Sequence, residues 1–176
     1  MNDRSISGKL KAYLQAEVWK LTIGGAFQRA NVYSPKADEH ARYDFRAGIV
    51  KRIDEMIRKQ YLTPVDEGRH LKNLLSLQKW IDTNYRHVLA GQHIRLGIVQ
   101  KLLNLNLKYR WSMGDIPEPP HCPLDRIILG KLDIRPVPTW TSLDCPKEYI
   151  RLIDEVRVVA GSDSIAVWEL RTYSRR

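Results

Sequence analysis

Residues 96–109 form an almost continuously apolar run, which constrains the fold more than any other part of the chain. Ile98, Leu102, Leu105 and Tyr109 recur at intervals that place them on one face of a helix. That face is widened by Val99, Leu103 and Leu107. A helix that is hydrophobic around most of its circumference must pack on several sides. We therefore predict a central and largely buried helix.

Apolar residues at helical spacing recur along the rest of the chain, and no alternating strand pattern persists. The helices are delimited by Gly24-Gly25 and Gly91 as stops, by Thr63-Pro64 as a start, and by Asp144 and Ser162 as N-caps. The first helix, residues 5–21, is expected to bury Leu10, Tyr13, Leu14, Val18 and Leu21. The others are expected at about residues 38–60, 65–81, 84–90, 97–109, 123–132, 145–160 and 163–173. The pattern predicts an all-α fold, a single compact domain spanning residues 1–176, with about eight helices around the central one.

The charge balance favours a polyanionic partner. The chain carries 29 Lys and Arg against 20 Asp and Glu, a net charge of +9, and such an excess suits DNA, RNA or an anionic membrane. The positive residues are spread along the chain, which argues against a lipid-directed tail. No apolar run is long enough for a membrane span, and the N-terminal residues lack a signal-peptide pattern. Two cysteines, Cys122 and Cys145, are too few for a disulfide framework, so we expect a cytoplasmic protein.

The otherwise apolar central helix carries one polar stripe, formed by Lys101, Asn104 and Lys108. Downstream, Asp125 lies at the beginning of the next predicted helix, so it is expected to face Lys101. Burial and a helix N-terminus both disfavour a charged lysine, and a neutral lysine amine can form a Schiff base with a sugar aldehyde equivalent. The same residues also fit a solvated stripe and an ordinary acid at a helix start. Both interpretations stay open at the level of sequence.

Two short segments resemble the helix-hairpin-helix DNA glycosylases of base-excision repair. They are Gly97-Ile98-Val99-Gln100-Lys101 continuing into Asn104, and Pro123-Leu124-Asp125, within about residues 91–132. The resemblance implies a helix-hairpin-helix-like fold in which Gly97 presents its backbone N–H to a DNA phosphate. It further implies that Lys101 attacks the sugar of an extruded nucleotide and that Asp125 assists. The cysteine quartet that holds an iron–sulfur cluster in some relatives is missing, so no cofactor is expected.

A DNA glycosylase must also hold an extruded base between flat side chains and bind the duplex around it. The base-pocket candidates are Tyr109, Trp111, His121, Trp140 and Trp168. Trp140 is the best of them because its proline-rich loop has no helical face to explain it. The DNA-binding candidates besides Gly97 are Gln92, His93, Arg95 and Lys108. Ordinary surface positions in a turn explain the first three equally well.

The sequence thus favours a DNA-binding base-excision glycosylase, with or without AP-lyase activity, that acts on an oxidised purine through Lys101. Two alternatives remain, a non-catalytic helical module for nucleic-acid or protein binding, and an accessory protein whose basic surface docks an acidic partner. A metal site is not expected, because His121-Cys122 with the distant Cys145 does not reproduce a zinc spacing.

Overall fold

The computed structural model describes residues 3–173, and within them it is all-helical. The α-helices are α1 (Asp3–Phe27), α2 (Glu39–Gln60), α3 (Glu67–Tyr85), α4 (Leu96–Ser112), α5 (Arg126–Leu129), α6 (Pro146–Ala160) and α7 (Ile165–Thr172). Two 3₁₀ turns, η1 (Ala90–Gln92) and η2 (Trp140–Ser142), complete the elements. The described residues contain no strand, so the all-α prediction is confirmed.

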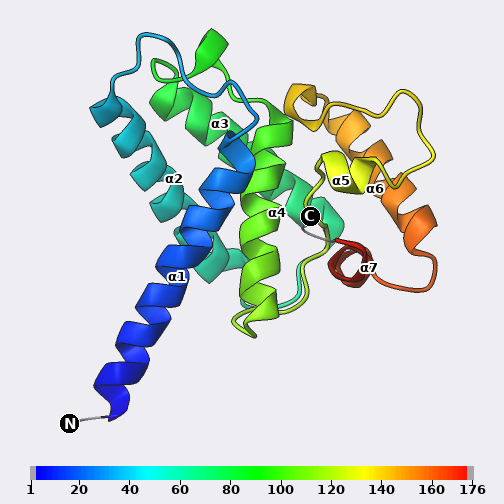
Figure 1. Ribbon diagram of the computed structural model, residues 1–176, viewed down its shortest axis with the longest axis horizontal. Helices are drawn as coiled ribbons and strands as arrows, with labels where there is room; N and C mark the ends of the chain where they lie inside the picture. Colours follow the sequence, from blue (N-terminus) through cyan, green and yellow to red (C-terminus); the bar gives the residue numbers. More distant parts are fainter. Residues whose placement is uncertain (1–2, 174–176) are drawn as a thin grey trace.

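Helix α4 is the centre of the molecule. In Figure 1 it stands between α1 and α2 on one side and α5, α6 and α7 on the other, while α3 crosses behind it. All residues from Leu96 to Lys108 are buried, and α1, α3 and η2 make the main contacts with α4. The central, buried helix that the apolar run predicted is therefore present.

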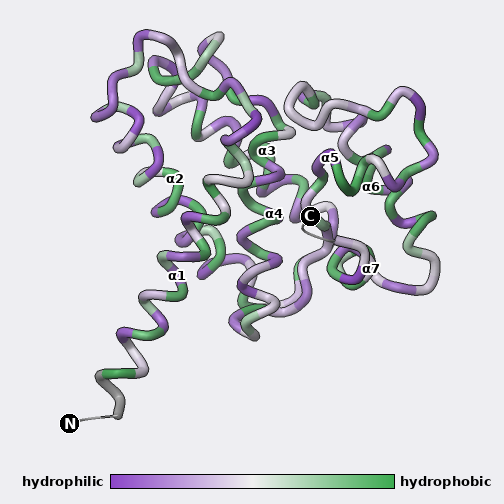
Figure 2. The backbone as a smooth tube through the Cα atoms, in the orientation of Figure 1, coloured by the Kyte–Doolittle hydropathy of each residue, from purple (hydrophilic) through white to green (hydrophobic). Residues whose placement is uncertain are grey.

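Helix α1 differs from the prediction in its length and in what it buries. It continues through Gly24-Gly25 to Phe27. A Cβ added at Gly25 would lie only 2.8 Å from the side chain of Leu105 on α4. Gly25 thus allows two helices to pack closely and does not end one. The first half of α1 projects away from the other helices (Figures 1 and 2), so several of its apolar side chains are exposed. They are Leu10, Tyr13 and Leu14; Leu21, in the second half of α1, is exposed as well.

Three predicted helix caps were wrong. In α3 and α7 a different polar side chain forms the cap, and α6 has no side-chain cap. Asp66, and not Thr63, accepts the N–H of Arg69 at the start of α3. Ser164, and not Ser162, caps α7. Asp144 does not cap the following helix, because its carboxylate accepts the N–H of Leu96 at the start of α4.

The connections on either side of α4 also depart from the prediction. The expected helix at 84–90 is absent, because α3 runs on to Tyr85 and the chain then turns into η1 around Gly91, which has a φ of 67°. The helix expected at 123–132 is reduced to α5, a single turn. Asp125 is its N-cap and accepts the N–H groups of Ile127 and Ile128.

Candidate functional site

Lys101 and Asp125 meet in a nearly closed site beside α4. The Lys101 Nζ lies 2.5 Å from Asp125 Oδ2, and the two side chains are only 7% and 13% exposed. Lys101 belongs to the second turn of α4, one turn further from the helix N-terminus than the sequence suggested. Asp125 is held independently, because its other oxygen caps α5. The structure therefore brings the two predicted catalytic residues together on rigid elements.

Burial makes the Lys101 amine easier to deprotonate. The loss of hydration lowers the pKa of Lys101, and the charge and hydrogen bond of Asp125 oppose this without cancelling it, so the net pKa is lowered. A lysine with a lowered pKa is neutral more often at neutral pH than a surface lysine. The alternative that Lys101 belongs to a solvated stripe is wrong, because the residue is 5% exposed.

A second buried ion pair lies two turns along the same face of α4. The Lys108 Nζ is 2.8 Å from Glu169 Oε1 and 2.7 Å from Oε2, and Glu169 comes from α7. Burial raises the pKa of Glu169, although the hydrogen bond from Lys108 opposes this rise. Lys108 was predicted to bind DNA from the surface, but in this structure it is 9% exposed and its ammonium is already paired. That prediction does not fit the structure.

Aromatic rings stand over both buried ammonium groups. The Trp140 ring centroid is 5.8 Å from Lys101 Nζ, and the Tyr173 centroid is 4.4 Å from Lys108 Nζ. Electron-rich ring faces attract cations at such distances. Trp140 is the base-pocket candidate that the structure places beside Lys101.

The other base-pocket candidates lie further along α4, on α7 or in the core. Tyr109 and Trp111 follow Lys101 on α4 by about 12 and 15 Å of helix rise. Trp168 is half-buried on α7. His121 is completely buried, with its Nδ1 bonded to the Tyr149 hydroxyl at 2.8 Å. It is therefore packed inside the protein and does not line an open pocket.

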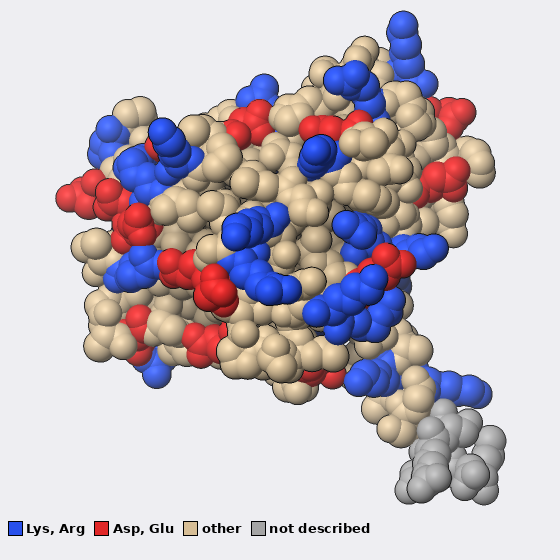
Figure 3. All heavy atoms as spheres, turned by 180° about the vertical axis from the view of Figure 1, so that it is seen from behind, with Lys and Arg blue, Asp and Glu red and all other residues tan. Residues whose placement is uncertain are grey.

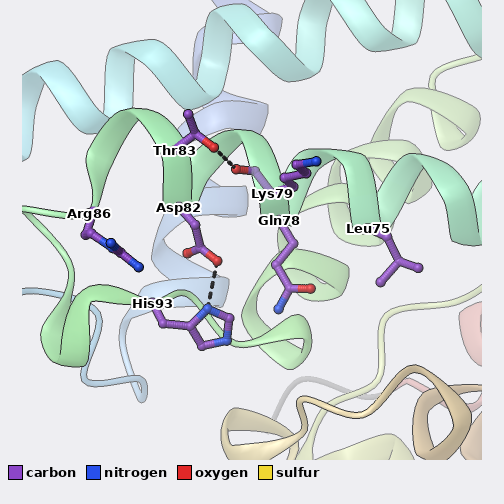
Figure 4. Close-up of a pocket in the computed structure, with 7 residues that line it drawn as sticks. All are labelled: Leu75, Gln78, Lys79, Asp82, Thr83, Arg86 and His93. Carbon is purple, nitrogen blue, oxygen red and sulfur yellow. Dashed lines mark hydrogen bonds and ion pairs between the residues drawn. The ribbon is translucent and has the colours of Figure 1, made fainter.

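His93 binds the segment between η1 and α4 to two other parts of the protein. Its Nδ1 lies 2.7 Å from Asp82 of α3, and its Nε2 lies 2.8 Å from Asp144 before α6. Figure 4 shows the ring directed at Asp82. The same two carboxylates accept the N–H groups of Ile94 and Leu96. His93 was predicted to contact DNA, and here both of its ring nitrogens are engaged by carboxylates.

An open polar cavity of about 530 Å³ lies beside His93 (Figure 4). Its lining comes mostly from α3 and consists of Leu75, Gln78, Lys79, Asp82, Thr83, Arg86 and His93. The two remaining DNA-binding candidates, Gln92 and Arg95, are exposed. Gln92 has a φ of 61°, and Arg95 donates to the Ser142 carbonyl. Neither lies among the residues that line this cavity.

The His93 contacts predict a characteristic pH dependence of stability. Burial lowers the pKa of His93, but the hydrogen bonds and charges of Asp144 and Asp82 outweigh it, so the pKa is raised above 6.5. The stabilisation that protonated His93 gives to the folded protein is therefore complete below pH 6.5. It is lost as pH rises through the raised pKa of His93. Asp144 has a pKa below its usual 3.8, because the N–H of Leu96 and His93 outweigh the effect of burial. The contribution of the Asp144 carboxylate to the free energy of unfolding is lost only as pH falls through that lowered pKa.

We expect the variant His93→Gln to lose most stability relative to wild type between about pH 4.5 and 6.5. The difference should shrink above neutrality, as His93 loses its proton in the folded protein. Urea denaturation at a series of pH values measures this difference. A constant difference from pH 5 to 9 would contradict the assignment of His93 as a charged partner.

Gly97 serves close packing of the backbone. A Cβ at this position would lie 1.8 Å from the carbonyl oxygen of Trp140, and the Gly97 N–H donates to the Leu143 carbonyl at 2.7 Å. The predicted phosphate contact does not fit this arrangement, because that N–H already has a partner. Gly97 instead lets η2 lie against the first turn of α4, which brings Trp140 toward Lys101.

Gly97→Ala is expected to lower the free energy of unfolding by about 1–3 kcal/mol, because the rigid backbone of η2 must move to admit a methyl group. Gly24→Ala is the matched control, since a Cβ at Gly24 meets nothing within 4 Å, and it should be neutral or slightly stabilising. Thermal unfolding of both variants checks this. Equal stabilities for the two variants would contradict the packing role of Gly97.

Basic side chains are spread over the surface together with acidic ones. On the face opposite to that of Figure 1, Lys and Arg are interspersed with Asp and Glu (Figure 3).

Among residues 3–173, no group of three or more His, Cys, Asp and Glu side chains is arranged to hold a metal ion. Within the same part of the chain, no helix is both long and apolar enough to cross a bilayer.

Comparisons with models of protein families, with curated proteins and with solved structures found no match to this chain. What the site can do is therefore inferred from its own residues. Three buried polar contributors were given no role from the sequence: Gln100 and Asn104, which were noted only as part of the central helix, and Glu169. Each is a polar residue within an apolar helical run, and all three are buried. An isolated polar residue on an apolar helix face was the available signal, because such a residue needs a buried partner.

Proposed function

We propose that the protein binds DNA and removes a damaged base, with Lys101 as the nucleophile and Asp125 as its acid–base partner. The observation that carries this proposal is the buried Lys101–Asp125 contact at 2.5 Å. A lysine nucleophile must be neutral, and a carboxylate within hydrogen-bond distance is suited to accept its proton. The proposed DNA partner also accords with the net charge of +9.

The proposed reaction begins when Asp125 accepts a proton from the Lys101 ammonium. The free amine then attacks C1′ of the sugar, a C–N bond forms, and the bond from C1′ to the base breaks. The base leaves with that electron pair and takes up the proton that Asp125 holds. The nitrogen now bonded to C1′ passes one of its protons to the ring oxygen as the C1′–O bond breaks. Opening of the sugar ring gives a Schiff base, from which water releases the lysine, or from which β-elimination expels the 3′ phosphate and nicks the strand.

Trp140 is the proposed surface on which the extruded base stacks. Its ring lies next to the Lys101 amine, and flat side chains commonly hold a base that has left the duplex. We propose an oxidised purine such as 8-oxoguanine as the substrate. A larger opening beside Trp140 must form when DNA binds, because Lys101 is only 5% exposed in the free protein.

The test compares wild type with Lys101→Met on duplexes that contain 8-oxoguanine or an abasic site. Wild type should release the base or nick the abasic strand, and Lys101→Met should do neither while still binding the duplex. Lys79→Met is the control, because Lys79 lies on α3, on the rim of the cavity beside His93. Equal activity of wild type and Lys101→Met would contradict the proposal.

A non-catalytic DNA-binding module is the second candidate. It is favoured by the low exposure of Lys101, because a closed and satisfied ion pair can serve the fold alone. This function predicts salt-dependent duplex binding without base release, strand nicking or a covalent adduct. The absence of salt-sensitive binding would argue against both candidates.

A further inference from the structure

Two fully buried amide side chains of α4, Gln100 and Asn104, bind the chain segment that leads into Asp125. This segment, residues 122–125, has no regular secondary structure. Backbone of that kind must find hydrogen-bond partners when it is buried. The partners here are side chains that project from the same helix as Lys101.

Gln100 binds both polar backbone groups of Leu124. Its Nε2 donates to the Leu124 carbonyl at 2.8 Å, and its Oε1 accepts the Leu124 N–H at 3.1 Å. A two-point contact fixes both the position and the direction of the peptide. Because Lys101 follows Gln100 and Asp125 follows Leu124, this contact lies directly beside the ion pair.

Asn104 fixes the orientation of the Gln100 amide. Its Nδ2 donates to Gln100 Oε1 at 3.2 Å, and it also lies 3.1 Å from the Cys122 carbonyl. The Asn104 Oδ1 is 2.9 Å from His70 Nε2. Burial lowers the pKa of His70 to about 4, so at neutral pH the ring is neutral. We assign its proton to Nε2, because the Asn104 oxygen can only accept.

We propose that Gln100 is a positioning residue, which holds the Asp125 carboxylate against the Lys101 amine through the backbone of Leu124. This inference rests on the proposed function, because it assigns a purpose to the pairing of these two groups. If Gln100 loses its amide, Leu124 is no longer bound to α4. The contact of Asn104 with the Cys122 carbonyl then holds only the start of the segment, and Asp125 can move away. Lys101 would then lose the opposite charge that favours its protonated form.

The test uses Gln100→Met, which keeps an unbranched side chain but makes no hydrogen bond to Leu124. Gln78→Met is the matched control, because the Gln78 amide also donates to a backbone carbonyl, that of Ile94. The first measurement is NMR titration of lysine labelled with ¹³C at Cε, with the Lys101 signal assigned by its loss in Lys101→Met. The second is the pH dependence of borohydride trapping on an abasic duplex, normalised to the folded fraction.

In Gln100→Met we expect Lys101 to titrate at lower pH than in wild type. Maximal trapping should fall at least about tenfold, and its acid limb should move to lower pH. Gln78→Met should titrate and trap like wild type. If Gln100→Met does not fold, Gln100→Asn replaces it, because its amide is one methylene too short to reach Leu124.

An unchanged Lys101 titration in the folded Gln100 variant would overturn the inference, whatever the loss of stability. If wild type itself forms no adduct, the proposed function fails. The titration still decides the positioning role in that case, since it needs no DNA. A shifted Lys101 signal without trapping would show that Gln100 sets the geometry of an ion pair that serves only the fold.

Discussion

Asp125→Asn is expected to slow release of the damaged base by about 10²–10⁴-fold in single-turnover experiments, the usual contribution of a positioned acid or base. Asparagine cannot accept the proton that Lys101 must lose. Its side-chain oxygen can still cap α5, where Asp125 Oδ1 accepts the N–H groups of Ile127 and Ile128. The change therefore removes the acid–base group and leaves the helix start in place.

Asp125→Ala is the companion variant, and it should cost about 1 kcal/mol more stability than Asp125→Asn, because alanine removes the cap as well. Both variants should show the same loss of rate when they are compared at equal folded fraction. A wild-type rate for folded Asp125→Asn would remove Asp125 from the reaction. Single-turnover assays on an 8-oxoguanine duplex, together with urea denaturation, provide both comparisons.

Glu169→Ala is expected to lower the free energy of unfolding by about 3–5 kcal/mol, because it leaves the buried Lys108 ammonium without a counterion. In a chain of 176 residues this corresponds to a fall in Tm of roughly 10 °C. The Glu169 side chain is 2% exposed, so water is poorly placed to replace it. Thermal and urea unfolding measure the effect.

The double variant Lys108→Met with Glu169→Leu separates the charge from the packing. It removes both buried charges at similar volume, and such replacements are often neutral or stabilising. We therefore expect it to recover most of the stability that Glu169→Ala loses. If the single and double variants are equally unstable, the loss arises from packing of α7 and not from an unpaired ammonium.

The sequence predicted those features that arise within one segment or between near neighbours in sequence. The buried α4 followed from its apolar residues, because a helix that is hydrophobic on most sides has few alternatives to a central position. The meeting of Lys101 with Asp125 was also expected, and the contact at 2.5 Å confirms it. The two residues are 24 positions apart, and the chain between them consists of the rest of α4 and the single connection of residues 113–125.

Features that depend on distant partners were not predictable from local pattern. Asp144 was expected to cap α6, but its carboxylate accepts the N–H of Leu96 at the start of α4, because η2 folds back onto the first turn of that helix. Lys108 is buried only because α7 supplies Glu169. Gly97 was expected to face a phosphate, and the close approach of Trp140 could not be foreseen from the glycine alone.

Helix α1 illustrates the limit of amphipathic patterns. Its stripe of Leu10, Tyr13 and Leu14 has the spacing of a buried face, yet the structure leaves these residues exposed. Periodicity shows that one face of a helix is apolar. It does not show whether another part of the same chain covers that face.

The measurement that tests the central claim most directly is peptide mapping of the adduct formed with an abasic duplex and borohydride. We predict a single covalent attachment, on the peptide that contains Lys101, with no adduct in Lys101→Met and a normal adduct in Lys79→Met. An adduct on any other lysine, or none with wild-type protein under conditions where the duplex is bound, would contradict the assignment of Lys101 as the nucleophile.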